Sequence, residues 1–292
     1  MNQTKYAVFT MDVETFTDTE CLYSHGLTAD VDVLDGMEEY LKILDRHGIK
    51  GTLFTVGDLA PQIVDRLKPH ISNGHTLALH SYSHVAPMSV PVDQFREKTL
   101  QAKLQLSKLF NTEVKGFRAP CFSMDRDRLN ILQELGFCYD SSCLDFLKAR
   151  HTVKLDLSNF ETLRDGIFRK DNFYEFGLSK EKVFGMCFPI SGGGYVRLGH
   201  WDFIRNLIWR HIRHHDYYVF YLHPFELTKQ KIPFFKELKS YDKYYLKQGI
   251  STFGKRVEQI IQMLKKCGYE FVTYEQLTKI MSKEQQPAYS IR

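Results

Sequence analysis

The chain has 292 residues, 43% of them hydrophobic and 25% charged, and its formal net charge is +4 at pH 7. These values are ordinary for a compact soluble protein with a large core, and they exclude a disordered chain. Lysines are spread among acidic residues, so no block of positive charge marks a nucleic-acid partner. The densest basic stretch, 229–266, predicts a solvated helix face whose aromatic side chains point inward.

The chain shows no linker-like or repetitive segment, which predicts a single domain over 1–283 and a short tail at 284–292. Its six cysteines form no C-x-x-C pair, so they indicate neither a zinc–thiolate site nor a disulfide framework. A reducing, cytoplasmic compartment is therefore expected. The first apolar run, 6–11, is too short for a signal sequence, and no apolar run approaches the length of a transmembrane helix.

Strands and helices are predicted to alternate along the chain. The strand-like runs lie at 6–11, 51–56, 76–80, 115–118, 137–139, 183–190, 217–222 and 270–272. Helical patterns lie at 34–44, 61–67, 92–110, 125–135, 201–212 and 253–267, and Thr273 and Gln276 have capping-box spacing for a short last helix. The stretch 141–180 is an irregular excursion carrying loops or added strands. This order predicts a parallel α/β fold whose active site lies at the carboxyl ends of the strands.

Candidate metal ligands follow two of these strands. Asp12 and Glu14 are two residues apart at the end of the first strand, so both carboxylates face the same side if the strand continues. His80 and His84 share one face if the chain turns helical there, and with Glu14 they form a two-histidine, one-carboxylate set that suits a divalent metal. The alternatives are carboxylates that cap a turn and histidines that are merely solvated.

Three more polar residues end later strands. Arg118 offers five donors that can hold a carboxylate, while Asp140 is a further acid and His223 is a histidine that apolar neighbours could tune as a proton donor. A surface cation and a core histidine with a backbone partner are the competing interpretations. Tyr195 and Arg197 follow three glycines that allow close approach of a sugar, although a glycine-rich turn with a structural tyrosine explains them equally well.

These segments, in this order, resemble the polysaccharide deacetylase (NodB-homology) family, carbohydrate esterase family 4, over nearly the whole chain. Thr10 to Glu14 resembles the family's Thr-Phe-Asp-Asp motif with the second acid displaced by one residue, and 80–84 matches its His-(Ser/Thr)-x-x-His motif. Arg118 and Pro120 match Arg-x-Pro, with Cys121 in the aromatic position. Asp140 and the Leu-His pair at 222–223 resemble the remaining motifs. The segments 139–142, 191–195 and 221–226 look most like bacterial enzymes encoded with exopolysaccharide or O-antigen synthesis.

The resemblance implies a distorted (β/α)7 barrel with one divalent ion on Glu14, His80 and His84. Zinc is the first expectation, and Co²⁺, Ni²⁺, Fe²⁺ or Mn²⁺ are alternatives. It also implies that Asp12, held by Arg118, is the general base. Because the second acid of the first motif is displaced by one residue, the reverse assignment, with Asp12 as the metal ligand and Glu14 as the base, stays open.

The resemblance assigns the remaining steps as well. The backbone N–H of Cys121 would stabilise the oxyanion, and His223, oriented by Asp140, would protonate the leaving amine. Phe122 would join Tyr195 and Arg197 in contacting the sugar.

The implied reaction is hydrolysis of an N-acetyl amide on an amino sugar or polysaccharide, which releases acetate and a free amine in surface-polysaccharide biosynthesis. One alternative is an amidohydrolase of the same scaffold that acts on a small linear amide or a formamido-sugar lipid. Another is a non-catalytic sugar-binding protein. The identity of the sugar, its carrier and the oligomeric state remain open.

Overall fold

The computed structural model describes residues 3–144 and 154–284, and these residues are organised around a curved ten-stranded sheet. Seven of its strands form one continuous parallel series, in the spatial order β11, β1, β2, β3, β4, β5, β8. Their bounds are β1 (Lys5–Val13), β2 (Thr52–Thr55), β3 (Thr76–Leu79), β4 (Gly116–Phe117), β5 (Tyr139–Asp140), β8 (Phe173–Phe176) and β11 (Tyr217–Leu222). This parallel series confirms the predicted distorted (β/α)7 barrel.

The excursion after β5 adds strands to the barrel. The strands β6 (Glu161–Arg164) and β7 (Ile167–Lys170) continue the sheet antiparallel beyond β8, while β12 (Tyr269–Phe271) pairs with the start of β1. The gap between β8 and β11 is spanned by the hydroxyl of Ser179, which accepts a hydrogen bond from the Val219 N–H at 3.0 Å. The barrel is therefore nearly closed. Because strands from both ends of the chain share one sheet, the single-domain expectation is also confirmed.

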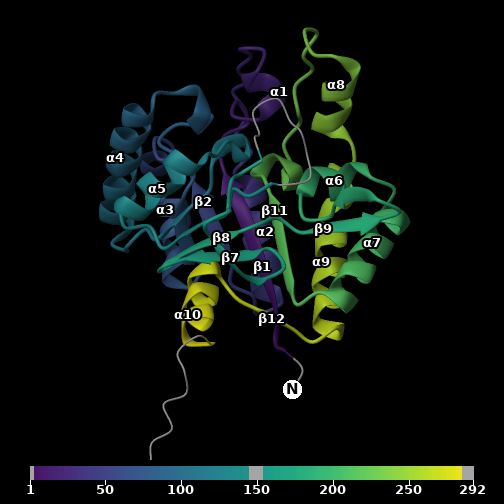
Figure 1. Ribbon diagram of the computed structural model, residues 1–292. Coiled ribbons are helices and arrows are strands. Elements are labelled where there is room, and N and C mark those ends of the chain that lie inside the picture. The colour runs from purple at the N-terminus through teal and green to yellow at the C-terminus, as the bar shows by residue number, and fades with distance from the viewer. Residues whose placement is uncertain (1–2, 145–153, 285–292) are drawn as a thin grey trace, which may run out of the picture.

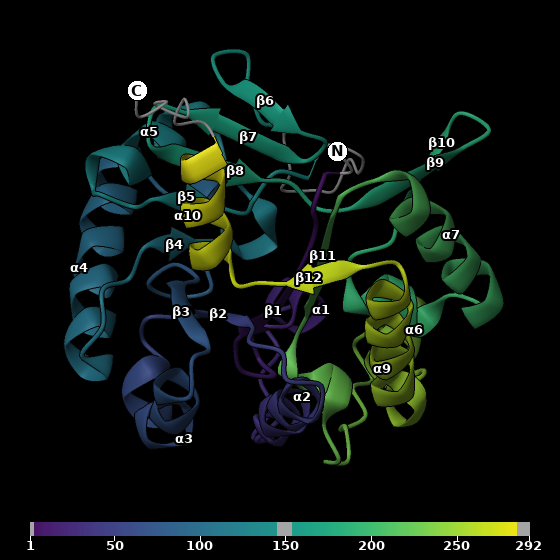
Figure 2. The same cartoon turned by 90° about the horizontal axis from the view of Figure 1, so that it is seen from below.

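Helices surround the barrel, as Figures 1 and 2 show. Their bounds are α1 (Glu20–Tyr23), α2 (Asp35–Arg46), α3 (Ala60–Ser72), α4 (Val92–Phe110), α5 (Arg126–Glu134), α6 (Gly193–Leu198), α7 (Trp201–His214), α8 (Ser240–Lys247), α9 (Ile250–Lys266) and α10 (Tyr274–Glu284). Short 3-10 turns lie at 87–89, 120–122 and 224–227. In the part of the chain that the structure covers, none of the helices has the length and apolar character needed to cross a membrane.

The first strand illustrates how the barrel aims polar groups at its mouth. Successive side chains of a strand point to opposite faces, so Tyr6 and Val8 pack inside the barrel while Phe9 and Met11 pack against the outer helices. The same alternation places Asp12 on the inner face, at the carboxyl end of β1. At the opposite end, α10 covers the barrel with Tyr274, which belongs to the inner core.

Three details of the prediction are wrong or fall outside the structure. The expected single strand 183–190 is a hairpin of β9 (Lys180–Val183) and β10 (Met186–Pro189), because Phe184 and Gly185 adopt positive φ angles of 50° and 81° and turn the chain. The chain from 81 to 84 forms bends and not a helix, beginning with Ser81 at φ 65°. The tail expected at 284–292 lies outside the described residues except for residue 284. Residues 145–153 of the expected excursion, 141–180, also lie outside them.

Candidate metal and catalytic site

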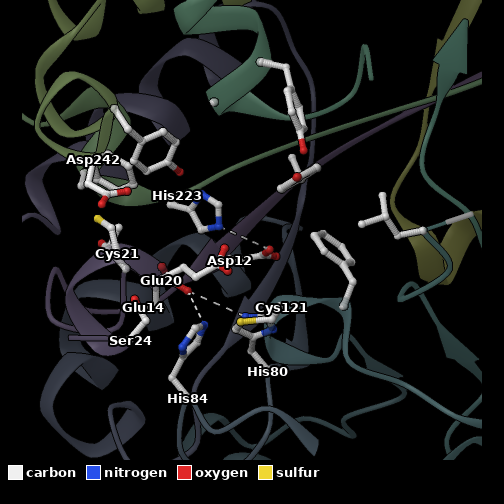
Figure 3. Close-up of a pocket in the computed structure, with 18 of the residues that line it drawn as sticks. Asp12, Glu14, Glu20, Cys21, Ser24, His80, His84, Cys121, His223 and Asp242 are labelled. Atoms are coloured by element: carbon white, nitrogen blue, oxygen red, sulfur yellow. Dashed lines mark ion pairs between the residues drawn. The ribbon is translucent and has the colours of Figure 1, made fainter. Parts of the chain in front are cut away.

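A cavity of about 370 Å³ opens at the carboxyl ends of the barrel strands, and its floor gathers residues that are far apart in the sequence. Figure 3 shows His80, His84, Glu14, Asp12 and His223 arranged around this floor. Of the residues predicted as site residues, those that line the cavity are Asp12, Glu14, His80, His84, Cys121, Phe122, Tyr195 and His223. Arg118, Asp140 and Arg197 do not line it.

Glu14, His80 and His84 converge on one point. The Glu14 Oε2 atom lies 2.8 Å from His84 Nε2 and 3.8 Å from His80 Nε2, and all three side chains are buried. His80 Nδ1 is 2.8 Å from the backbone oxygen of Arg118, which can only accept, so Nδ1 carries the proton and Nε2 presents its lone pair to the cluster. Two histidines and one carboxylate are a ligand set that suits a divalent ion. The two histidines are brought together by bends in the chain and not by the expected helix.

The protonation states of His80 and Glu14 fit ligand roles. Burial lowers the pKa of His80 to about 4, so its imidazole is neutral at pH 7. Burial favours the protonated form of Glu14, but the adjacent His84 and the nearby His223 outweigh it and lower the pKa of Glu14 to about 2. A neutral imidazole and an ionised carboxylate are the forms that bind metal. Burial favours a neutral His84, but the carboxylate of Glu14 outweighs burial and raises the pKa of His84, so a bound metal would displace a proton from that ring.

Asp12 is held by a fully buried guanidinium. Arg118 Nη1 donates to Asp12 Oδ1 at 2.7 Å and to the Thr10 hydroxyl at 2.8 Å. The other donors of Arg118 reach the backbone oxygen of Ser141 at 3.1 Å and its hydroxyl at 3.0 Å, and the guanidinium stacks over the ring of Phe54. These contacts compensate the burial of both charges and leave Asp12 Oδ2 turned toward His223 Nε2 at 4.0 Å.

The partner of His223 differs from the expectation. Glu226 Oε2 accepts a hydrogen bond from the backbone N–H of His223 at 3.1 Å and lies 3.3 Å from the ring atom His223 Nδ1. The other oxygen of Glu226, Oε1, accepts from Arg197 Nε at 3.2 Å. Burial lowers the pKa of His223, but the carboxylates of Glu14, Glu226 and Asp12 outweigh burial and raise it to about 9. His223 is thus an imidazolium at neutral pH, with Nδ1 directed at Glu226 and Nε2 at the cavity.

Two predicted roles therefore need correction. Arg197 is 1% exposed and donates to Glu226, so it supports the partner of His223 and does not line the cavity. Gly193 leaves room for the same carboxylate, since a Cβ atom at this position would lie 2.2 Å from Glu226 Oε2. Asp140, expected to orient His223, is instead paired with another acid below the floor of the cavity.

That acid is Glu175, and the two carboxyl groups share a proton. Glu175 Oε1 accepts the backbone N–H groups of Ser142 and Cys143, at 3.0 and 2.8 Å. Burial and the charge of Asp140 raise the pKa of Glu175 well above its usual range, while burial raises the pKa of Asp140 to about 6. Asp140 Oδ1 accepts from the Ser142 hydroxyl, which accepts the Ala119 N–H, so the pair supports the turn that follows Arg118.

The turn at Cys121 is strained. Cys121 and Phe122 adopt φ angles of 54° and 53°, a left-handed conformation that costs energy for residues other than glycine. The conformation places Cys121 at the cavity and leaves its backbone N–H without an acceptor among the described residues. Burial raises the pKa of the Cys121 thiol to about 12, so the thiol is not a nucleophile at neutral pH.

The walls and rim of the cavity contain residues that the sequence did not single out. Tyr221, Phe225 and Tyr245 form an aromatic wall, and α1 and α8 contribute Glu20 and Tyr241 at the rim. Tyr241 is 68% exposed and Tyr244 48% exposed, so the aromatic residues of the basic stretch do not all point inward as expected. Only Glu226 had a sequence signal, because it follows His223 at the spacing of a helical cap.

Two family profiles match most of the chain. Residues 23–139 match the polysaccharide deacetylase family, and residues 157–279 match a family described as a domain of unknown function (DUF3473). Among curated relatives, a peptidoglycan deacetylase-like protein of Gibberella zeae is 32% identical over 37% of this chain and 32% of that protein. A peptidoglycan-N-acetylglucosamine deacetylase of Bacillus cereus is 28% identical over 33% of this chain and 36% of that protein. The match thus spans about a third of the length of these curated relatives.

Solved structures of the same fold include two informative examples. A putative polysaccharide deacetylase from Mycobacterium smegmatis has a TM-score of 0.58 at 15% identity, covering 98% of this chain and 94% of that one. A carbohydrate esterase family 4 pseudoenzyme from Bacillus anthracis has a TM-score of 0.55 at 12% identity, covering 95% and 66%. At these identities the likeness establishes the fold alone, and the fold is shared by a pseudoenzyme, so activity has to be argued from the residues of this chain.

Proposed function

From the match of residues 23–139 to the polysaccharide deacetylase family, we propose that this chain is a metal-dependent hydrolase that removes an N-acetyl group from an amino sugar or a polysaccharide. The observation that carries the proposal is the floor of one cavity, where a metal-type cluster, a buried carboxylate held by arginine and a charged histidine face one another. These are the three kinds of group that amide hydrolysis requires: an electrophile, a base and an acid.

Glu14, His80 and His84 would hold the metal, with zinc first among the divalent ions. When bound, such an ion polarises the amide carbonyl and eases deprotonation of water. Asp12 would take the water proton at Oδ2, because Arg118 engages Oδ1 and leaves Oδ2 directed at the cavity. The backbone N–H of Cys121, which has no acceptor among the described residues, would donate to the developing oxyanion.

His223 would supply the proton that the leaving nitrogen needs. An amine is expelled from the tetrahedral intermediate only after protonation, and His223 Nε2 faces the same space as Asp12 Oδ2. Glu226 favours the imidazolium and fixes its Nδ1 side, so the proton to be transferred lies on Nε2. Tyr195 and Phe122 would contact the sugar, together with the aromatic wall.

The cellular setting is part of the proposal. Cys187 is an exposed free thiol, and Cys21, Cys121, Cys138 and Cys267 are also free thiols, which suits a reducing cytoplasm. A cytoplasmic deacetylase of this kind would act on a nucleotide-linked or lipid-linked precursor in surface-polysaccharide biosynthesis.

Acetate release tests the function directly. The metal-loaded protein should release acetate and a free amine in equal amounts from at least one N-acetylated nucleotide sugar or oligosaccharide, and His84→Ala should abolish this together with metal binding in the cavity. Binding of such sugars without acetate release, at full metal occupancy, would identify a sugar-binding protein instead. Release of formate from formamido sugars alone would favour the other amidohydrolase activity.

A further inference from the structure

A second cluster of two histidines and a carboxylate lies outside the cavity. Glu181 is on β9, while His211 lies on α7 and His215 directly follows it, one helical turn further on. The two imidazoles stack with ring centroids 4.2 Å apart, and Glu181 and His211 are only 5% and 4% exposed. Figure 2 shows β9 beside α7, and Asp165 reaches the cluster from the turn between β6 and β7.

The hydrogen bonds around the cluster determine which ring nitrogens carry protons. His211 Nε2 lies 3.2 Å from the backbone oxygen of Tyr217, which can only accept, so Nε2 is the protonated nitrogen of a neutral ring. His215 Nδ1 lies 2.9 Å from the carboxylate of Asp165 and is protonated for the same reason. In its neutral form, each ring therefore presents a bare nitrogen on its other side.

Both bare nitrogens face one carboxylate oxygen. His211 Nδ1 lies 3.3 Å from Glu181 Oε2 and has no hydrogen bond among the described residues, and His215 Nε2 lies 4.0 Å from the same oxygen. Three lone-pair donors that converge in this way repel one another unless a cation lies between them. Carbonyl and carboxylate acceptors behind each imidazole are the arrangement that orients histidine ligands in metal sites.

A third group of similar composition shows that the geometry is selective. Asp45, His70 and His75 also lie close together, but the Gly51 N–H donates to His75 Nδ1 at 3.0 Å. The proton of neutral His75 is therefore on Nε2, which lies 3.4 Å from Asp45 and satisfies that carboxylate directly. Both groups combine two histidines with one carboxylate. In this group, however, His75 directs a proton and not a lone pair at the carboxylate of Asp45.

We infer that Glu181, His211 and His215 bind a divalent cation of the zinc class at a structural site separate from the cavity. Arg210 Nε holds Glu181 Oε1 at 2.7 Å, which leaves Oε2 for the metal. The side chain of His215 is 32% exposed, so solvent water can reach the cluster to complete a four-coordinate shell. The metal ties the β9–β10 hairpin to α7, within the stretch that matches the domain of unknown function.

Metal stoichiometry of the full chain tests the inference. Protein stripped with a chelator, reloaded with Zn²⁺ and desalted should retain about two equivalents per chain if both sites fill. His215→Ala, at a half-buried position that the fold tolerates more readily than His211, should retain about one, and His70→Ala in the third group should remain at about two. Asp165→Asn should weaken binding at this site by about 10- to 100-fold, as for other groups that orient a ligand.

The cavity site and this site can fail independently. In Glu14→Gln, Zn²⁺ should still raise the melting temperature, and adding His215→Ala to that variant should remove the effect. The inference is overturned if the parent protein retains only one equivalent of Zn²⁺ and this equivalent is lost in Glu14→Gln but kept in His215→Ala. A proton would then balance the charge of the Glu181 cluster. One equivalent that survives Glu14→Gln and disappears in His215→Ala supports the inference and refutes the catalytic metal.

Discussion

The floor and the rim of the cavity are built in different ways. Asp12, Glu14, His80 and His84 in the floor are buried, and Arg118 supports the floor from beneath through contacts with Asp12, Thr10 and Ser141. At the rim, by contrast, the short elements α1 and α8 contribute partly exposed side chains such as Tyr241. Rigid floors suit chemistry that needs fixed distances, and exposed rims suit recognition that varies between substrates. The two regions should therefore respond differently to mutation.

The largest effect is expected from Asp12→Asn in the floor. The change preserves volume and the contact with Arg118 but removes basicity, so kcat should fall at least about 100-fold while metal content stays unchanged. Acetate-release kinetics and metal analysis measure the two quantities. Glu14→Gln is the matched variant, and it should lose the metal of the cavity. The opposite pattern, with metal lost in Asp12→Asn and kept in Glu14→Gln, would exchange the two assigned roles.

A smaller, pH-dependent effect is expected from Glu226→Gln. The pKa of His223 is raised to about 9 with Glu226 present, and removal of one opposing charge should lower it by about 1 to 3 pH units. Because the acid must be protonated, the alkaline limb of the kcat profile should move to lower pH by that amount. An unchanged limb accompanied by a uniform loss at every pH would mean that Glu226 has only a structural role.

At the rim, Tyr241→Ala should change recognition and leave the chemistry intact. Loss of one exposed aromatic contact should raise KM by a few-fold, on the order of 1 kcal/mol, with kcat unchanged. Tyr244→Ala is the control, because Tyr244 lies on the same helix, is also exposed and does not line the cavity. A fall in kcat for Tyr241→Ala would show that the rim takes part in the reaction.

The smallest effect on activity is expected from Glu175→Gln beneath the floor, where stability and its pH dependence should change instead. The pKa of Asp140 is raised from 3.8 to about 6 in the folded chain, so the stabilisation by this pair is complete below pH 3.8 and is lost as the pH rises through about 6. An amide can replace the protonated acid, so Glu175→Gln should flatten this decline in denaturant unfolding. A slope identical to that of the parent protein would contradict proton sharing.

The sequence by itself determined the strand–helix alternation of a parallel α/β fold and the residues that follow its strands, whereas the barrel was implied by the family resemblance. These features depend on local periodicity and on the meeting of carboxyl strand ends at one edge, so Asp12, Glu14, His80, His84 and His223 could be placed together before any coordinates. The spacing of His80 and His84 correctly predicted that the two side chains lie together, but it predicted a helix where the chain forms bends. A bend can bring two side chains together as well as a helix can.

Only the tertiary structure decided which partner each charged group has. Arg197 and Glu226 are 29 residues apart, as Glu175 and Asp140 are 35 apart, and no local pattern indicates that burial pairs them. A buried charge accepts whichever compensating group the fold brings within reach, so its role depends on long-range packing. For the same reason Arg197, which had suggested sugar binding, supports His223 through Glu226, and the proton positions that separate the second metal cluster from the third group became visible only in three dimensions.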